Sequence, residues 1–212
     1  VHHLRGMFGF VIWDCNRQLL FGARDHFGIK PFYYVHSGRE FVFASEIKSI
    51  LASGAVQKNV RTDALTHYFT FQYVPEPMTM FENIHKLPPG HLITATADGK
   101  LNVRQYWDPT FEPDQSRSFN DVVEEIRETL KESVKLHMQS DVKRGCFLSS
   151  GIDSTAISTM MRSIEPIKTF SVGFEGPNNE TVISRETAKA IGTEHYAKII
   201  TRKDYFASLP QA

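Results

Sequence analysis

The chain has 212 residues, and its 24 Lys and Arg residues balance its 24 Asp and Glu residues, so the formal net charge is zero. A neutral chain has no overall field to attract it to nucleic acid or an anionic membrane, and no apolar run approaches the roughly 20 residues of a membrane span. Two cysteines are too few for a disulfide framework, which fits a reducing cytosol, and the nine histidines show no pairing that predicts a zinc site.

Four short segments in the first 45 residues are rich in Phe, Tyr, Val and Ile, as is typical of β-strands. They are GMFGFVIWD (6–14), QLLFGAR (18–24), PFYYV (31–35) and EFVFAS (40–45). The turns between them are too short for crossover helices, so we expect antiparallel neighbours. Phe10 and Ile12 share one face of the first segment, and Val11 lies on the other. Because both faces are apolar, we expect the sheet to be covered on both sides.

Two helices, a hairpin and a linker are expected next. The sequence SEIKSILAS (45–53) predicts a short helix, and TDALTHYFTFQY (62–73) predicts another with Thr62 as its N-cap. A hairpin signal follows around the turn at Asp98 and the glycine after it. The polar, proline-bearing segment 108–118 is interpreted as a linker between two domains.

From Ser118 onward, helix and strand signals alternate. Ser118 and Asp121 resemble a capping box, with Asp in place of the more usual Glu, and apolar residues follow at helical spacing. The later strand signals are 144–148, 167–173 and 195–200, and the helix signals between them are about 153–163 and 182–191. Such alternation indicates parallel βαβ units with right-handed crossovers.

The sequence CFLSSGIDST (146–155) places small hydroxyl residues and one carboxylate directly after an expected buried strand. Ligands of open parallel sheets bind at the carboxyl ends of the strands, where a helix N-terminus offers free N–H groups to an anion. Ser149, Ser154 and Thr155 add hydroxyl donors. Asp153 would repel a polyphosphate unless a cation lay between them, and Mg²⁺ suits that role. The sequence therefore predicts a site for the phosphates of ATP; an ordinary capped helix is the competing interpretation.

The loop has neither the Lys of G-x-x-x-x-G-K-[ST] nor the three glycines of G-x-G-x-x-G. It resembles the PP-loop, S-G-G-x-D-S, of ATP pyrophosphatases, which split ATP into AMP and pyrophosphate and adenylate a carboxylate or carbonyl oxygen. Ser150 replaces the first glycine, a conservative change if its φ is negative.

The resemblance implies that a set of residues around this loop and the next strand binds ATP and pyrophosphate. They are Phe147, Leu148, Ser149, Ser150, Gly151, Asp153, Ser154 and Val172. Within the set, Asp153 would hold Mg²⁺ together with the phosphates, and Val172, in KTFSVGF, would lie beside the base.

Longer segments, in chain order, resemble glutamine-dependent asparagine synthetase of the bacterial type. They are LRGMFGFVIWD, GARDHFGIKPFYY, FVFASEIKSI, YFTFQYVPEPMTMFENIHKLPPGH, and FLSSGIDST followed by TFSVGF. The resemblance implies an α+β fold followed by an α/β fold. Residues 1–107 would be the C-terminal portion of a class II glutamine amidotransferase domain, an incomplete αββα sandwich of the N-terminal nucleophile type. After the linker 108–118, residues 119–212 would begin a Rossmann-like, parallel-sheet ATP pyrophosphatase domain, also incomplete.

This family converts aspartate to asparagine with ATP, using glutamine as nitrogen donor, through a β-aspartyl-AMP intermediate. The implied cofactors are ATP and Mg²⁺, and the implied partners are glutamine and aspartate, with no nucleic acid or membrane; a homodimer is common in the family. Asp25, in ARDHFG, matches the acid that binds the α-ammonium of glutamine, because a fixed carboxylate pairs well with an ammonium. Its other interpretation is a turn or salt-bridge residue beside Arg24.

The family's nucleophile is an N-terminal cysteine, and Val1 is not cysteine. We therefore expect the nucleophile upstream of this sequence and no catalytic residue within it, so that the polypeptide alone has neither glutaminase nor synthetase activity. Cys15 lies in an expected turn with no terminal amine to act as its base, and Cys146 is expected to pack as a small hydrophobe.

Two alternatives to asparagine synthesis stay open. β-Lactam synthetases and related amide-forming enzymes share both domains but act on another carboxylate. A non-catalytic, degenerate scaffold, with Ser150 as the first sign of decay, is the other. GMP and NAD synthetases share the PP-loop, but the antiparallel strands within residues 4–45 argue against them.

Overall fold

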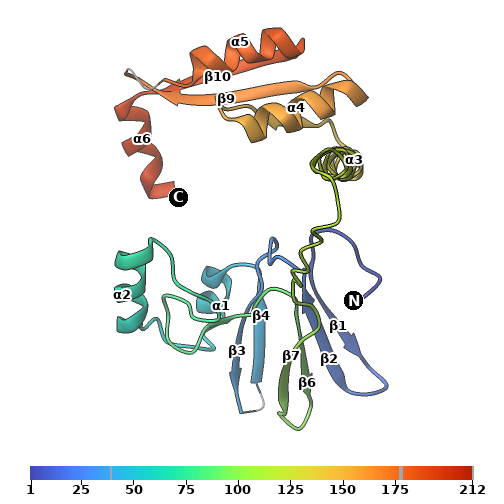
Figure 1. The fold of residues 1–212 in the computed structure, drawn as a ribbon. Helices are drawn as coiled ribbons and strands as arrows, with labels where there is room; N and C mark the ends of the chain where they lie inside the picture. The colour runs from blue at the N-terminus through green and yellow to red at the C-terminus, as the bar shows by residue number, and fades with distance from the viewer. Residues whose placement is uncertain (39, 177–178, 212) are drawn as a thin grey trace. The chain divides into compact units, whose positions relative to one another are not determined.

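The computed structural model describes residues 1–38, 40–176 and 179–211. The chain divides into two compact units, Val1–Glu112 and Pro113–Ala212. The division falls inside the segment 108–118 that the sequence suggests as a linker. In Figure 1 the first unit runs from blue to green and the second from yellow-green to red.

The first unit contains two antiparallel sheets, with strand orders β1-β2-β6-β7 and β4-β3-β5. Its elements are β1 (Gly9–Asp14), β2 (Leu19–Arg24), β3 (Tyr33–Ser37), β4 (Glu40–Ala44), α1 (Ile47–Ser53), α2 (Thr62–Phe71), β5 (His85–Lys86), β6 (His91–Thr96) and β7 (Leu101–Gln105). The four strands and the hairpin expected from the sequence are present, and β1 with β2, β3 with β4, and β6 with β7 are antiparallel as predicted. The expectation that the first four strands form one sheet is wrong, because β2 and β3 lie in different sheets.

The two sheets pack face to face through an apolar cluster. Phe32, Tyr34, Leu87 and Ile93 form its buried part, and Val11 of β1 packs against it. On the other face of the β4-β3-β5 sheet, Ile50 of α1 packs against Val35 and Ile84. This sheet is therefore covered on both sides.

The outer face of β1 differs from the expectation of full coverage. Ile12 alternates with Val11 along the strand and so points away from the second sheet. It is 56% exposed. The expectation that both faces are covered thus holds for the β4-β3-β5 sheet but not for this part of β1.

A buried arginine ties several loops of the first unit together. Arg24, at the end of β2, is only 2% exposed. Its Nε atom donates to the carbonyl oxygen of Lys30 (2.7 Å), and its terminal nitrogens donate to those of Leu87 (2.6 Å) and Gly28 (2.5 Å). The carboxylate of Glu76 lies 3.1 Å from Nη1 and balances the charge. We call these five residues the Arg24 cluster.

Gly28 is required within the Arg24 cluster for two reasons. Its φ is +64°, a conformation that residues with a side chain rarely adopt. A Cβ atom at this position would also lie 2.8 Å from the Arg24 guanidinium. The sequence Arg24-Asp25-His26-Phe27-Gly28 therefore folds as a tight turn around the buried charge.

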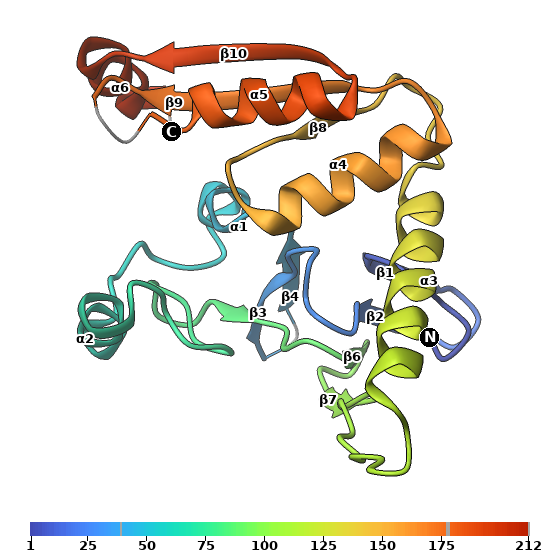
Figure 2. The same cartoon turned by 45° about the horizontal axis from the view of Figure 1, so that its top comes forward.

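The second unit is a parallel sheet with helices, as the alternation of signals predicts. Its elements are α3 (Phe119–His137), β8 (Gly145–Phe147), α4 (Ile152–Ile164), β9 (Lys168–Phe174), α5 (Thr181–Ile191), β10 (Glu194–Ile200), α6 (Arg202–Ser208) and the short 3₁₀ segment Leu209–Gln211. The strand order is β10-β9-β8 and both pairings are parallel. Figure 2 shows α4 and α5 beside each other, with α5 running along β9 and β10.

The predicted helix caps have different outcomes. The hydroxyl of Ser118 accepts the N–H of Asp121 at 3.2 Å, so the N-cap of α3 is confirmed. The capping box is incomplete, because the Asp121 carboxylate accepts the Ser118 hydroxyl (2.7 Å) in place of the Ser118 backbone N–H. Thr62 as the N-cap of α2 is wrong, because Thr62 is the first helical residue and Arg61 occupies the cap without a side-chain bond. Within the described ranges, no helix is both long and apolar enough to cross a membrane.

The Arg24 cluster should dominate the stability of the first unit. We expect Arg24→Met to lower the free energy of unfolding by about 3–5 kcal/mol, because it leaves the backbone carbonyl groups of the Arg24 cluster without their donor. Glu76 keeps Lys86 as its ion-pair partner in this variant, so the loss comes from the carbonyl groups. Urea unfolding followed by tryptophan fluorescence measures this, since Trp13 and Trp107 both lie in the first unit.

Arg17→Met is the matched control. Its side chain is 79% exposed and lies 3.8 Å from Asp14, so its loss should change the unfolding free energy by no more than about 1 kcal/mol. Equal effects of the two substitutions would contradict a structural role for the Arg24 cluster.

Candidate functional site

Residues 149–154, which we call the serine loop, follow the carboxyl end of β8. They comprise the turn at 149–151 and the first residues of α4, which begins at Ile152. The backbone N–H of Ser149 donates to the hydroxyl of Ser154 (3.1 Å), and the two hydroxyl oxygens lie 2.8 Å apart. The N–H of Gly151 donates back to the hydroxyl of Ser149 (3.1 Å). These bonds fold the loop into a tight bend and hold both hydroxyl groups beside the beginning of the helix.

The N-terminus of α4 has no side-chain cap. Its N-cap residue is Gly151, and neither a serine nor an aspartate side chain accepts the first helical N–H groups. An ordinary capped helix would use such a side chain. The first turn of α4 therefore carries N–H groups and a positive dipole end that are suited to an anion.

The residues of the predicted phosphate site are accessible. Ser149, Ser150, Gly151 and Asp153 are exposed and Ser154 is half-buried. Ser150 is not among the described residues with positive φ, so its side chain in place of the motif glycine does not strain the backbone.

The flanking residues of the predicted site differ in what they can offer. Phe147 is 76% exposed, whereas Leu148 is buried and its N–H donates to the carbonyl of Phe170 (2.8 Å). Leu148 could therefore reach a ligand only through its carbonyl oxygen. Val172 is 53% exposed on β9, on the face that it shares with Phe174.

A cavity of about 480 Å³ lies at the carboxyl ends of β9 and β10, the same edge of the sheet as the serine loop. Phe174, Glu175, Ile200, Arg202 and Tyr205 line it. These residues were not predicted as site residues from the sequence. The signal that could have indicated them is that KTFSVGF (168–174) and the following strand are expected to end at the same edge of the sheet.

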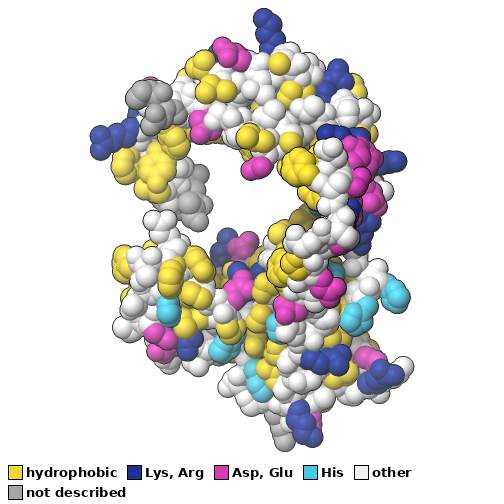
Figure 3. Space-filling model, in the orientation of Figure 1, with side chains coloured by type: hydrophobic (Ala, Val, Ile, Leu, Met, Phe, Trp, Pro, Cys, Tyr) yellow, Lys and Arg dark blue, Asp and Glu magenta, His cyan; other side chains and the backbone are white. Residues whose placement is uncertain are grey.

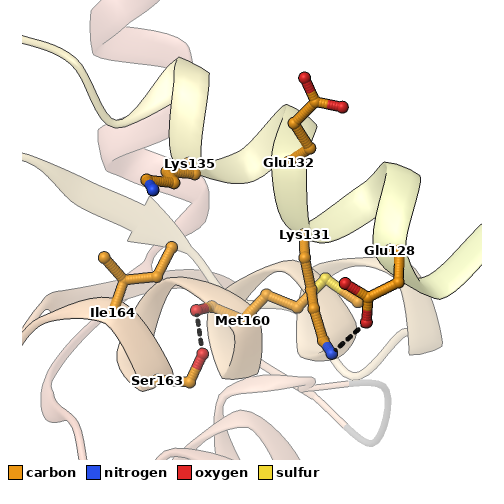
Figure 4. Close-up of a pocket in the computed structure, with 7 residues that line it drawn as sticks. All are labelled: Glu128, Lys131, Glu132, Lys135, Met160, Ser163 and Ile164. Atoms are coloured by element: carbon orange, nitrogen blue, oxygen red, sulfur yellow. Dashed lines mark hydrogen bonds and ion pairs between the residues drawn. The ribbon is translucent and has the colours of Figure 1, made fainter.

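A second cavity, of about 310 Å³, lies between α3 and α4 (Figure 4). Met160, Ser163 and Ile164 line it from α4, and Glu128, Lys131, Glu132 and Lys135 line it from α3. Lys131 pairs with Glu128 at 2.6 Å. Met160 follows Gly151 by nine residues, about 13 Å along a helix, so this cavity is separate from the serine loop.

Asp153 does not belong to a cluster of metal-ligating side chains in the described part of the chain. Within residues 1–38, 40–176 and 179–211, no three His, Cys, Asp or Glu side chains come together in a way that could hold a metal ion. A cation at the exposed carboxylate of Asp153 would need phosphate oxygens and water as its other ligands, which is how Mg²⁺ commonly binds.

Asp25 accepts four backbone hydrogen bonds and is 1% exposed. Its Oδ1 atom accepts the N–H groups of Phe27 (3.2 Å) and Ile29 (2.9 Å), and its Oδ2 atom accepts those of Phe8 (3.3 Å) and Lys30 (2.9 Å). Burial would raise the pKa of Asp25, but the four donors outweigh it and hold the pKa below its ordinary value. This geometry favours the turn-forming interpretation, and glutamine binding by Asp25 stays a prediction.

The two cysteines lie where the sequence predicts. Cys15 is exposed in the turn between β1 and β2. Cys146 of β8 packs against the cluster that contains Val134 and Ile167, and the hydroxyl of Ser158 donates to its sulfur at 3.3 Å. Its packing as a small hydrophobe is confirmed, although it is half-buried rather than buried.

An apolar surface patch on α2 lies outside the predicted site. Tyr68, Phe69 and Phe71 are exposed there, with Phe69 at 80%. Figure 3 shows hydrophobic side chains, in yellow, at the surface of the first unit over α2. The patch is typical of a contact surface rather than of a chemical site.

Comparisons with known proteins agree with both halves of the sequence pattern. Residues 1–107 match the family model described as glutamine amidotransferase domain, and residues 125–212 match the model described as asparagine synthase. The first match covers half of the chain.

Similar proteins carry related names. The glutamine-hydrolyzing asparagine synthetase 1 of Bacillus subtilis (strain 168) is 42% identical over 212 residues, which are 98% of this chain and 33% of that protein. The putative glutamine-hydrolyzing asparagine synthetase 2 of Methanocaldococcus jannaschii is 35% identical over 97% of this chain and 41% of that protein. Amidase chyE of Penicillium rubens is 33% identical over 94% of this chain and 32% of that protein.

A solved structure also matches, that of glutamine phosphoribosylpyrophosphate amidotransferase from B. subtilis complexed with ADP and GMP. It covers 85% of this chain and 30% of that chain at 12% identity and a TM-score of 0.28, a likeness too weak to carry an argument. The chain spans from about one third to two fifths of the relatives named above. The chain therefore belongs to the glutamine amidotransferase domain family over residues 1–107, followed by the start of an asparagine synthase domain in residues 125–212.

Proposed function

We propose that the loop 149–154 binds the phosphates of ATP, with Mg²⁺, in an enzyme that converts aspartate to asparagine with glutamine as nitrogen donor. The reaction would proceed through β-aspartyl-AMP. The observation that carries the proposal is the exposed serine loop before the uncapped N-terminus of α4. The family match over residues 125–212 and relatives named asparagine synthetases support it.

Each predicted site residue has a part in this proposal. The N–H groups at the start of α4 and the hydroxyls of Ser149 and Ser154 would hold pyrophosphate oxygens. Asp153 would hold Mg²⁺ with those oxygens, and Ser150 and Gly151 would let the backbone approach them. Phe147 and Leu148 would flank the nucleotide, and Val172 would lie beside the base, two residues before Phe174 of the cavity at the same edge.

The domain assignments belong to the same proposal. Residues 1–107 would form part of an αββα sandwich, since two stacked sheets with α1 on one outer face supply three of its four layers. Residues 119–212 would form part of a Rossmann-like ATP pyrophosphatase domain after the linker 108–118. Neither Cys15 nor Cys146 has the setting of a glutaminase nucleophile, so we expect the 212-residue polypeptide to show no glutaminase turnover.

A second candidate is an amide-forming enzyme that acts on a different carboxylate. Its support is that a relative from Penicillium rubens, which matches 94% of this chain, is not named an asparagine synthetase but an amidase. Both candidates use the same serine loop. Product analysis of the enzyme with ATP, Mg²⁺, glutamine and aspartate distinguishes them, because only the first forms asparagine.

Magnesium-dependent ATP binding tests the nucleotide site directly. We expect calorimetry on the chain to detect ATP binding that requires Mg²⁺ and that Asp153→Asn weakens about tenfold or more, since a charged group in a desolvated contact contributes on the order of 1.5–3 kcal/mol. The matched control is Asp141→Asn, an exposed acid before β8, at the opposite end of the strand. Equal ATP affinity in the two variants would argue against Asp153 as the metal ligand.

The role of Asp25 is decided by Asp25→Asn. The amide would present N–H groups to N–H groups, so we expect the free energy of unfolding of the first unit to fall by about 1.5–3 kcal/mol. Because the pKa of the folded carboxyl is lowered, its contribution is full above the unfolded pKa of about 3.9 and is lost as the pH falls through the folded pKa.

Asp14→Asn is the control for Asp25→Asn, because Asp14 accepts two backbone N–H groups in an exposed turn. A glutamine-binding residue would instead leave stability unchanged in Asp25→Asn and raise the glutamine KM of the complete enzyme. That outcome would restore the prediction that Asp25 binds the α-ammonium.

A further inference from the structure

A chain of hydrogen bonds runs from the end of α5 to the middle of β9. The hydroxyl of Thr193 donates to the carbonyl oxygen of Ala188 (3.4 Å) and lies 2.8 Å from the hydroxyl of Thr169. The Nδ1 atom of His195 lies 3.0 Å from the Thr169 hydroxyl, and its Nε2 atom lies 3.1 Å from the hydroxyl of Ser171. These groups lie on the face of β9 and β10 that α5 covers.

The direction of these bonds follows from counting protons. Two directions fit these distances, because either hydroxyl can donate between Thr193 and Thr169. If Thr193 donates to Thr169 and Thr169 to Nδ1 of His195, then Nε2 donates to Ser171 and the Ser171 hydroxyl proton has no acceptor among these groups. In the opposite direction Ser171 donates to Nε2, Nδ1–H to Thr169, Thr169 to Thr193, and Thr193 to the Ala188 carbonyl, which also accepts two backbone N–H groups. Only this second direction gives every proton an acceptor, so it assigns the proton of the ring to Nδ1.

We propose that His195 is a positioning residue for the nucleotide site: as the neutral Nδ1–H tautomer it fixes the strand β9 that presents Val172. The ligand in this inference rests on the proposed function. The role is one of positioning because the ring points to the covered face of β9, whereas Val172 lies on the opposite face.

The position of Ser171 explains how the ring would act on the site. Ser171 immediately precedes Val172 and is 6% exposed. The next residue on the covered face, Gly173, is packed so closely that a Cβ atom there would lie 2.3 Å from Oδ1 of Asn179 and 2.7 Å from Cγ2 of Thr181. The two bonds of His195 and this close approach together fix β9 on both sides of Val172.

The charges around the ring favour its neutral form. Burial lowers the pKa of His195, and the charge of Arg185 on α5 lowers it further. The side chains that face the ring from β9 are Thr169 and Ser171, which are uncharged, while Lys168 and Glu194 pair with each other on the opposite face. Among the described residues, Arg185 is thus the charge that acts on His195.

Protonation at Nε2 would remove the acceptor of the Ser171 hydroxyl proton. The folded state binds the proton less readily than the unfolded chain, so the second unit should be most stable above the unfolded pKa of about 6.5 and lose stability as the pH falls below it. Affinity for ATP should fall over the same interval, because the strand beside Val172 loses its restraint.

The tautomer is tested by nitrogen-15 NMR of the histidine-labelled chain, in which long-range couplings distinguish Nδ1–H from Nε2–H. We expect His195 to be the neutral Nδ1–H form at pH 7.5, with a pKa below the ordinary histidine value of about 6.5. An Nε2–H ring, or a pKa at or above the ordinary value, would overturn the inference. This test needs no nucleotide, so its result stands apart from the proposed function.

Two variants test the positioning role. His195→Asn keeps a donor near Thr169 but cannot titrate. We expect its ATP affinity in MgCl₂ at pH 8 to be about two- to tenfold lower than that of the wild type. We also expect the decline of ATP affinity between pH 8 and pH 5.5 to disappear in this variant. His137→Gln is the control, because His137 is exposed on α3, and should keep both the ATP affinity of the wild type at pH 8 and its decline toward pH 5.5. A pH profile like that of the wild type in His195→Asn would contradict the proposal.

Thr193→Val provides a second test should His195→Asn fail to fold. Without the Thr193 hydroxyl, Thr169 is free to donate to the ring, and we expect the Nε2–H tautomer of His195 to appear in the spectrum. An unchanged tautomer would show that the chain of bonds does not set it. Failure of the wild type to bind ATP would count against the proposed function, while the tautomer measurements would still decide this inference.

Discussion

The parallel pairing of β8, β9 and β10 is the constraint on which the account of the second unit depends. Strands that run in the same direction bring their carboxyl ends to one edge of the sheet, and each crossover helix starts there. The sequence places Ser149 and its neighbours at that edge, and the glycine cap of α4 leaves the first helical N–H groups without a side-chain partner. The edge also holds the cavity between Phe174 and Tyr205. The geometry thus brings N–H groups without a side-chain partner and a hollow to the same edge of the sheet from separate segments of the chain.

Buried polar groups, rather than apolar packing alone, organise both units. In the first unit, Arg24 and Asp25 are neighbours in sequence, and both bind backbone groups of the turn that follows them, Arg24 its carbonyls and Asp25 its N–H groups. In the second unit, Thr169, Ser171 and His195 occupy positions where a parallel sheet usually has Val or Ile. Such networks are stabilising only when every group has a partner, which makes them specific for one arrangement.

Local signals predicted the elements well, and long-range partners could not be predicted. The Phe-, Tyr-, Val- and Ile-rich runs of β1 and β2, the turn at Asp98 and the cap at Ser118 depend on residues a few positions apart, and all are present. The Thr62 cap was wrong by one residue, because a helix start is set by competing local bonds. The carbonyl that Arg24 binds lies 63 residues away, at Leu87, and no local pattern indicates it. At the candidate site, the serine loop could be predicted because its residues are close together in the sequence. The cavity could not be predicted, because residues of β9, β10 and α6 line it together.

Amide mapping of the loop with magnesium pyrophosphate tests the central claim most directly. Pyrophosphate contains the part of ATP that the loop would hold, and nitrogen-15 NMR reports each backbone N–H separately. The account predicts that the largest shifts occur at the N–H groups of residues 150–154, that they require Mg²⁺, and that they saturate. Shifts that fall elsewhere, or no shift in residues 150–154 at saturating pyrophosphate, would contradict a phosphate site at the start of α4.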